Sequence, residues 1–307
     1  KYSVELLKKV AAEESINFSQ SESGGLMLFR DNKSLDDYVA LASHMAEHGV
    51  NYETLDRFEL ALKEPSLAAV ANELVGAVYL PNDYSANCYL FCQHISRLLQ
   101  QRGVNFLFNT SVQKIATSDA GIQIDVQGGS HQTDTVVIAA GNYSKPLAAS
   151  LGIKLPISPI KGYSISVPMG DWSNRPKYPV IDMNKHAGVN PLGNLLRVAG
   201  TAELAGMKAG VSERRVKYLI NLASQLYPEF AATIAPSEID PWGGHRPISV
   251  DGLPMIGATP VKGVYVNTGH GGMGWSQAAG SAKALADLMS GAEPEIDISA
   301  FSISRFA

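Results

Sequence analysis

The stretch GGHRPISVDGLPMIG spans residues 243–257, and a short apolar strand pattern at residues 263–267 leads from it into TGHGGMGW, residues 268–275. Alanine and leucine spacing predicts a helix directly afterwards, over residues 276–289. A glycine run that ends a strand and begins a helix is an anion-binding device, because the backbone can come close to a ligand and the helix offers free N–H groups. Arg246 lies upstream and can meet a second anion, so we expect both groups to face one pocket.

The rest of the chain alternates between helical and strand patterns. Apolar periodicity and capping residues predict helices over residues 3–14, 34–48, 54–62, 87–101 and 212–227. Apolar runs predict strands at residues 24–30, 76–80, 104–108, 135–140, 163–167, 180–183 and 195–198, with a small antiparallel meander at residues 112–116, 122–126 and around 133. These patterns indicate a mixed α/β fold.

Two motifs carry a family resemblance. The pattern Gly-x-Arg-Pro-x-x-x-Asp-Gly-x-Pro-x-x-Gly at residues 244–257, followed by NTGHGGMGW at 267–275, resembles the C-terminal part of the FAD-dependent D-amino-acid dehydrogenases. These enzymes belong to the wider D-amino-acid oxidase and glycine oxidase superfamily. The resemblance extends back through KGYS at 161–164, VIAAGNYS at 137–144, FNTSV at 108–112, LPND at 80–83 and GGLMLFR at 24–30. It therefore covers nearly the whole chain.

The resemblance implies a mixed α/β (α+β) fold with an FAD-binding Rossmann-like domain and an antiparallel-sheet substrate domain. We expect residues 1–85 to form part of the substrate or cap domain with a helical connection, and residues 86–150 to form part of the FAD-binding domain. Residues 151–238 would complete the substrate domain and residues 239–307 the FAD-binding domain. No Gly-x-Gly-x-x-Gly turn occurs early in the chain, so the FAD-binding domain is expected to be N-terminally incomplete, lacking roughly the first quarter of the family's length.

Two residues are candidates for the catalytic site. In the resembling enzymes the arginine of the Arg-Pro motif holds the substrate α-carboxylate, and here that residue is Arg246. The alternative is a structural ion pair, for instance with Asp251. Tyr163 starts the strand that would pass the flavin, and it either lines the substrate pocket or packs on the sheet.

The resemblance also implies a set of cofactor-binding residues. Val112 would supply backbone contacts to the adenine ring, and Gly141 would end a strand close to the FAD phosphates. The glycine-rich turn would face the pyrimidine end of the flavin and stabilise the negative charge of the reduced ring. The complete expected set is Val112, Gly141, Gly244, Arg246, Gly269, His270, Gly271, Gly272, Met273 and Gly274. His270 either hydrogen-bonds the flavin or packs.

The implied reaction is oxidative deamination of a D-amino acid, with hydride transfer from Cα to FAD and electrons passed to a quinone-type acceptor. An oxygen-using oxidase of glycine, sarcosine or proline is one alternative, and a non-catalytic fragment with impaired FAD binding is another.

The net charge of −4 and the lack of a basic tract argue against nucleic-acid binding. The sequence shows no metal-ligand cluster, and Cys88 and Cys92 are expected to be free thiols. We expect a cytoplasmic protein, and the family adds peripheral attachment to the cytoplasmic face of the inner membrane.

Overall fold

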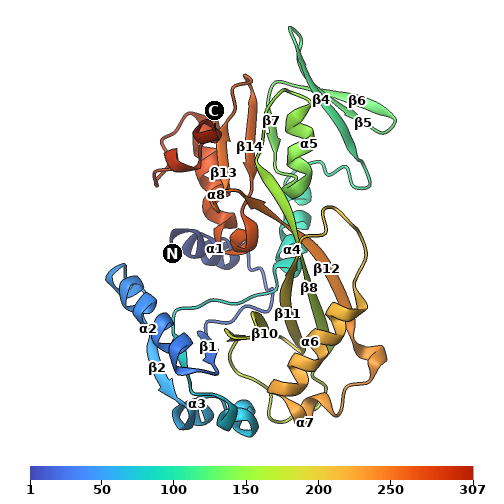
Figure 1. Ribbon diagram of the computed structural model, residues 1–307. Helices are drawn as coiled ribbons and strands as arrows, with labels where there is room; N and C mark the ends of the chain where they lie inside the picture. Colours follow the sequence, from blue (N-terminus) through green and yellow to red (C-terminus); the bar gives the residue numbers. More distant parts are fainter. Residues whose placement is uncertain (307) are drawn as a thin grey trace.

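An eight-stranded sheet forms the lower half of the molecule in Figure 1, which is a computed structural model describing residues 1–306. The strand order is β12-β8-β11-β10-β9-β1-β3-β2. In that order the bounds are β12 Asp240–Ser249, β8 Ile157–Pro168, β11 Leu195–Glu203, β10 Ala187–Leu192, β9 Val180–Asp182, β1 Gly25–Phe29, β3 Gly76–Leu80 and β2 Glu53–Asp56. All neighbours pair antiparallel except β9 and β1, which run parallel. The antiparallel substrate sheet expected from the sequence is therefore confirmed.

One face of this sheet is covered by α6 (Glu213–Leu226) and α7 (Pro228–Ala231). Side chains of a strand alternate between its two faces, so β8 sends Tyr163, Ile165 and Val167 to the helix side. They pack in one buried cluster with leucines of α6 such as Leu219 and Leu222. Burying a side chain of this size contributes about 1.5–3 kcal/mol, so this layer holds the sheet and α6 together.

The upper half holds two three-stranded sheets. One consists of β13 (Met255–Ala258), β14 (Val264–Thr268) and β7 (Val136–Ile138), and the other of β4 (Val112–Ser118), β5 (Gly121–Val126) and β6 (Gly129–Thr133). The helices around them are α1 Tyr2–Glu13, α4 Cys88–Gln101, α5 Ser144–Ala149 and α8 Gly274–Ser290. Because β12 runs from the large sheet into this upper half, it connects the two halves directly.

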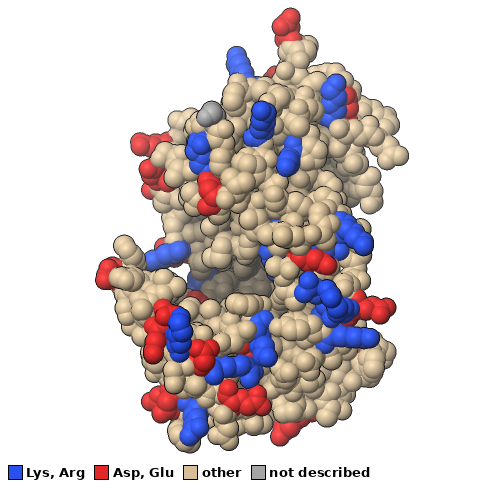
Figure 2. Space-filling model, viewed as in Figure 1, with Lys and Arg blue, Asp and Glu red and all other residues tan. Residues whose placement is uncertain are grey.

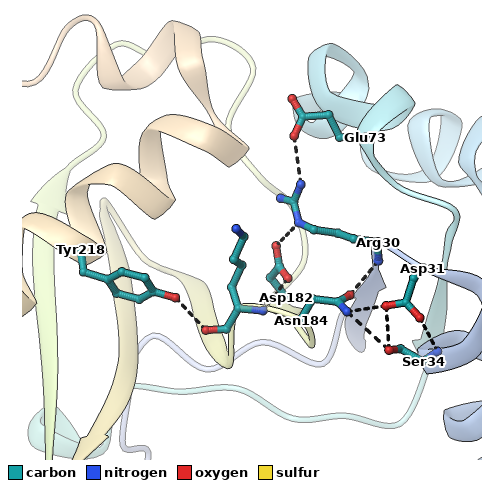
Figure 3. A network of polar contacts seen from close by, with 8 residues as sticks. Arg30, Asp31, Ser34, Glu73, Asp182, Asn184 and Tyr218 are labelled. Atoms are coloured by element: carbon teal, nitrogen blue, oxygen red, sulfur yellow. Dashed lines mark hydrogen bonds and ion pairs between the residues drawn. The ribbon is translucent and has the colours of Figure 1, made fainter.

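A buried ion pair joins strands β1 and β9 (Figure 3). The Arg30 Nε atom donates to Asp182 at 2.9 Å, and Asp182 is fully buried. Arg30 Nη1 reaches Glu73 at 2.9 Å, at the end of the 3-10 helix η1 (Pro65–Glu73). Asn184 links this pair to Asp31, which caps α2 (Asn32–Glu47). The network therefore fixes α2 and η1 against the far end of the sheet.

Most predicted elements are confirmed to within two or three residues at each end, but four differ. The strands predicted at residues 163–167 and 195–198 are both longer, since β8 already begins at Ile157 and β11 continues to Glu203. The helix predicted over 54–62 is α3 (Arg57–Lys63), because Asp56 forms a capping box with Glu59 and Thr54 pairs with β3 instead. The buried strand predicted at residues 104–108 is wrong. Val104, Leu107 and Phe108 are exposed, and no strand among residues 1–306 lies beside them to complete a hydrogen-bond ladder.

Candidate active site between the sheet and the glycine turn

The face of the large sheet opposite α6 forms the floor of the candidate site, and we call it the cleft face. Cross-strand partners share a face, so Gly162 and Ser164 of β8 lie on it beside Gly244 and Trp242 of β12. Figure 2 shows a hollow in the molecule between the half that contains α8 and the large sheet. Small floor residues leave room there for a ligand.

Arg246 projects from β12 over the cleft face. Its guanidinium lies against the backbone of Gly162, so close that a Cβ added to that glycine would overlap it. Its Nη1 atom donates to the carbonyl of Thr201 at 3.3 Å. None of the ion pairs within 4.0 Å in residues 1–306 includes Arg246. The guanidinium is therefore half-buried with its charge uncompensated by a carboxylate of the described chain.

Asp251, the alternative partner, pairs elsewhere. Arg305 Nε donates to Asp251 at 2.7 Å, and this ion pair, with a backbone hydrogen bond from Leu253, lowers the pKa of Asp251 to about 2. Asp251 therefore ties the C-terminal segment to the β12–β13 connection. It does not neutralise Arg246.

The glycine-rich turn lies directly beside Arg246. Gly269 and Gly271 have φ of +80° and +55°, a backbone region that residues other than glycine rarely adopt. A Cβ added to Gly272 would lie 4.0 Å from the Arg246 Cδ atom, which shows how closely η4 (Gly271–Met273) approaches the arginine. Helix α8 begins at Gly274 without a side-chain cap, so its first N–H groups and its partial positive charge remain available to an anionic ligand.

His270 is directed at α8. Its Nε2 atom lies 3.0 Å from the Ser281 hydroxyl, and burial lowers the pKa of the imidazole, which favours the neutral ring. This contact packs the ring against α8, and a hydrogen bond from His270 to the flavin stays a prediction. His270 holds the turn onto the helix that follows it.

A third element lies beside Arg246 and the glycine-rich turn in the candidate site. The 3-10 helix η2 (Gly141–Tyr143) follows β7 and contacts β12. Gly141 accepts from the Thr268 hydroxyl at 3.1 Å, and Asn142 Nδ2 donates to the His245 carbonyl at 3.2 Å. The buried Asn142 Oδ1 atom has no hydrogen-bond partner in residues 1–306. Buried polar atoms are rarely left unpaired, so this junction suits a polar ligand.

The structure brings most of the predicted residues together, but not Tyr163 or Val112. Tyr163 is 3% exposed on the helix side of β8, opposite Arg246, and its hydroxyl donates to Glu203. Period-two alternation with Ile165 and Val167 was the sequence signal for this position. Val112 begins β4 in the separate three-stranded sheet, where α5 rather than β12 packs on its strand. Gly244 lies on the cleft face under the ring of Trp242.

Two residues of the candidate site, Thr201 and Arg197, were not predicted from the sequence. Thr201 has φ of +64°, rare for a β-branched residue, at an irregularity in the pairing of β11 with β8. That conformation presents its carbonyl to Arg246, while its buried hydroxyl has no partner in the described chain. Arg197 lies further along the cleft face, with Nε 3.2 Å from Ser166.

Comparison with known proteins identifies the class that this fold and site define. The family model described as FAD dependent oxidoreductase matches residues 1–288, and the chain belongs to that family. It is 38% identical over 295 residues to a D-amino acid dehydrogenase of Vibrio vulnificus, covering 96% of this chain and 70% of the relative. A D-amino acid dehydrogenase of Bradyrhizobium diazoefficiens is 36% identical over 307 residues, covering 100% and 72%. The crystal structure of glycine oxidase from Geobacillus kaustophilus superposes with a TM-score of 0.90 at 26% identity, over 99% of this chain and 81% of that one.

The family is FAD-dependent, and the residues present suit such a cofactor. The glycine turn and the uncapped start of α8 follow β14, and Asn142 with its unpaired Oδ1 follows β7, the strand paired with β14. Among residues 1–306 no helix is long and apolar enough to span a bilayer, and no group of three metal-ligating side chains is present. Both cysteines are free and exposed.

Proposed function

We propose that this chain catalyses the FAD-dependent oxidative deamination of D-amino acids, giving an imino acid that hydrolyses to a 2-oxo acid and ammonia. The observation that carries the proposal is the Arg246 guanidinium beside the glycine turn, which forms an ion pair with no carboxylate of residues 1–306. A guanidinium binds a carboxylate through two parallel hydrogen bonds, which sets the orientation as well as the position of an amino acid. The choice of the D-series follows the names of the relatives at 36–38% identity.

Arg246 holds the substrate α-carboxylate in this scheme, and Gly162 and Ser164 form the floor beneath the Cα atom. FAD, when bound, supplies the acceptor for the hydride that leaves Cα. The amine lone pair assists the departure of the hydride, so no side chain of the chain has to remove a proton from Cα. The N–H groups of the turn and of α8 stabilise negative charge that develops against them. Electrons then pass to a quinone-type acceptor.

Anaerobic reduction of the bound flavin tests the proposal. We expect D-alanine to bleach the flavin absorbance band, with L-alanine and glycine much slower at equal concentration. Faster reduction by glycine or sarcosine would favour the oxidase activity that the glycine oxidase similarity suggests. Absence of flavin absorbance after reconstitution with FAD would support a non-catalytic fragment.

A further inference from the structure

We propose that Arg197 forms a side-chain subsite, so that the preferred substrate is an acidic D-amino acid of glutamate length. The inference rests on the proposed function in one respect, since it takes Arg246 as the group that holds the α-carboxylate. Its own basis is a second guanidinium on the cleft face of the sheet, the face that also carries Arg246. Arg197, like Arg246, takes part in no ion pair within 4.0 Å in residues 1–306.

The register of the sheet places Arg197 on the cleft face. It pairs with Ser166 on β8 and with Asn190 on β10, while its neighbours Leu196 and Val198 point into the core under α6. Its Nε donates to the Ser166 hydroxyl at 3.2 Å, and this contact holds the side chain against β8. Among residues 1–306 only the Nε–H group is used in this way, which leaves the two terminal nitrogens of the fork for a ligand.

The floor between the two arginines is made of small residues. On β8 they are Gly162 and Ser164, and on β11 and β10 the residues opposite Ser164 are Ala199 and Gly188. Trp242 forms a wall on the β12 side, paired with Ser164. No large side chain therefore stands on β8, β11 or β10 between the two charges.

The spacing selects the length of the ligand. The Arg246 guanidinium lies over Gly162 and Arg197 contacts Ser166, which is four residues further along β8. Four residues of strand span about 13 Å. An ion pair at each end takes up about 4 Å, so about 5 Å remain between the two carboxyl carbons. Four C–C bonds of an extended glutamate span that gap, whereas the three bonds of aspartate fall short.

Two residues near Arg197 reduce the expected preference for a side-chain carboxylate. Asp240 faces Ser166 from β12, so an exposed carboxylate lies at the rim of the subsite and opposes a second anion. Asn190 has a buried Oδ1 without a partner in the described residues, and this acceptor suits a carboxamide better than a carboxylate. The charge of Arg197 favours the carboxylate, because hydrogen bonds between charged groups are about twice as strong as neutral ones. We therefore expect D-glutamate to be preferred over its neutral isostere D-glutamine by about tenfold rather than more.

Equilibrium dialysis tests the subsite. The full chain is reconstituted with FAD, kept anaerobic and dialysed against radiolabelled D-glutamate or D-glutamine. Reduction of the flavin by the same two ligands is a second readout. In the wild type D-glutamate should show the roughly tenfold lower Kd. In Arg197→Gln that ratio should fall to about one, and Arg197→Lys should restore part of it. The matched control is Arg57→Gln, which removes an exposed positive charge from α3 and should keep the ratio.

Equal binding of the two ligands by the wild type, or a ratio that survives in Arg197→Gln, would overturn the subsite. These outcomes are separable from failure of the proposed function. If D-alanine reduces the flavin while the D-glutamate to D-glutamine ratio is one, only the subsite is wrong. If no D-amino acid reduces the flavin, the proposed function is wrong, and the dialysis ratio still decides the role of Arg197.

Discussion

The Arg246 guanidinium lies against the backbone of Gly162 on the neighbouring strand, and only a glycine leaves space for it there. The contact explains why the KGYS and HRP motifs, more than eighty residues apart in the chain, belong to one site. Gly162 sets the position of the guanidinium, while Thr201 accepts from it at the irregularity of β11.

The first prediction concerns Gly162→Ala. The added methyl group would overlap the guanidinium and move Arg246 away from the floor, so we expect kcat/KM for D-amino acids to fall at least tenfold. The matched control is Gly129→Ala on β6, outside the candidate site, where an added Cβ would meet no atom within 4 Å. Steady-state kinetics of both variants check this. Equal losses in the two variants would show that crowding at Gly162 has no special effect.

The second prediction separates charge from geometry at Arg246. Replacement by alanine removes the paired hydrogen bonds to a carboxylate, each worth about 1.5–3 kcal/mol, so we expect at least a hundredfold loss in kcat/KM. Arg246→Lys keeps the charge but not the planar fork, and it should fall between the wild type and the alanine variant. Stopped-flow flavin reduction measures all three proteins. Undiminished turnover in Arg246→Ala would exclude the proposed role.

Particular residues show how far the sequence predicts the site. The glycine turn and Arg246 were predictable, because special backbone conformations and a bidentate cation leave clear residue signatures. Thr201 was not, since its left-handed backbone arises from an irregularity between two strands and not from its residue type. Residues 104–108 have the composition of a buried strand, yet a strand also requires a neighbour, and composition does not report one.

The third prediction concerns the ion pair between Arg30 and Asp182. Asp182 is fully buried, so Arg30→Met leaves an uncompensated charge and should lower the free energy of unfolding by about 3 kcal/mol or more. Lys33→Met serves as control, because its pair with Asp37 is exposed and contributes about 0.5 kcal/mol or less. Urea unfolding followed by circular dichroism measures both. Similar midpoints for the two variants would refute the assignment.

The fourth prediction concerns pH and the C-terminal segment. The pKa of Asp251 is lowered from 3.8 to about 2 by the Arg305 guanidinium, so the folded state favours the charged carboxylate. A depressed pKa stabilises the fold fully above the unfolded value, and that contribution is lost as the pH falls from about 4 towards 2. We therefore expect the segment around η6 (Ile303–Phe306) to be released from the β12–β13 connection in this window.

Hydrogen exchange of the Leu253 amide, which donates to Asp251 at 3.1 Å, should quicken more than intrinsic exchange predicts as the pH is lowered. In Asp251→Asn the carboxylate is gone, so protection should be weak at every pH and show no transition. A transition of the same size in that variant would show that another group titrates.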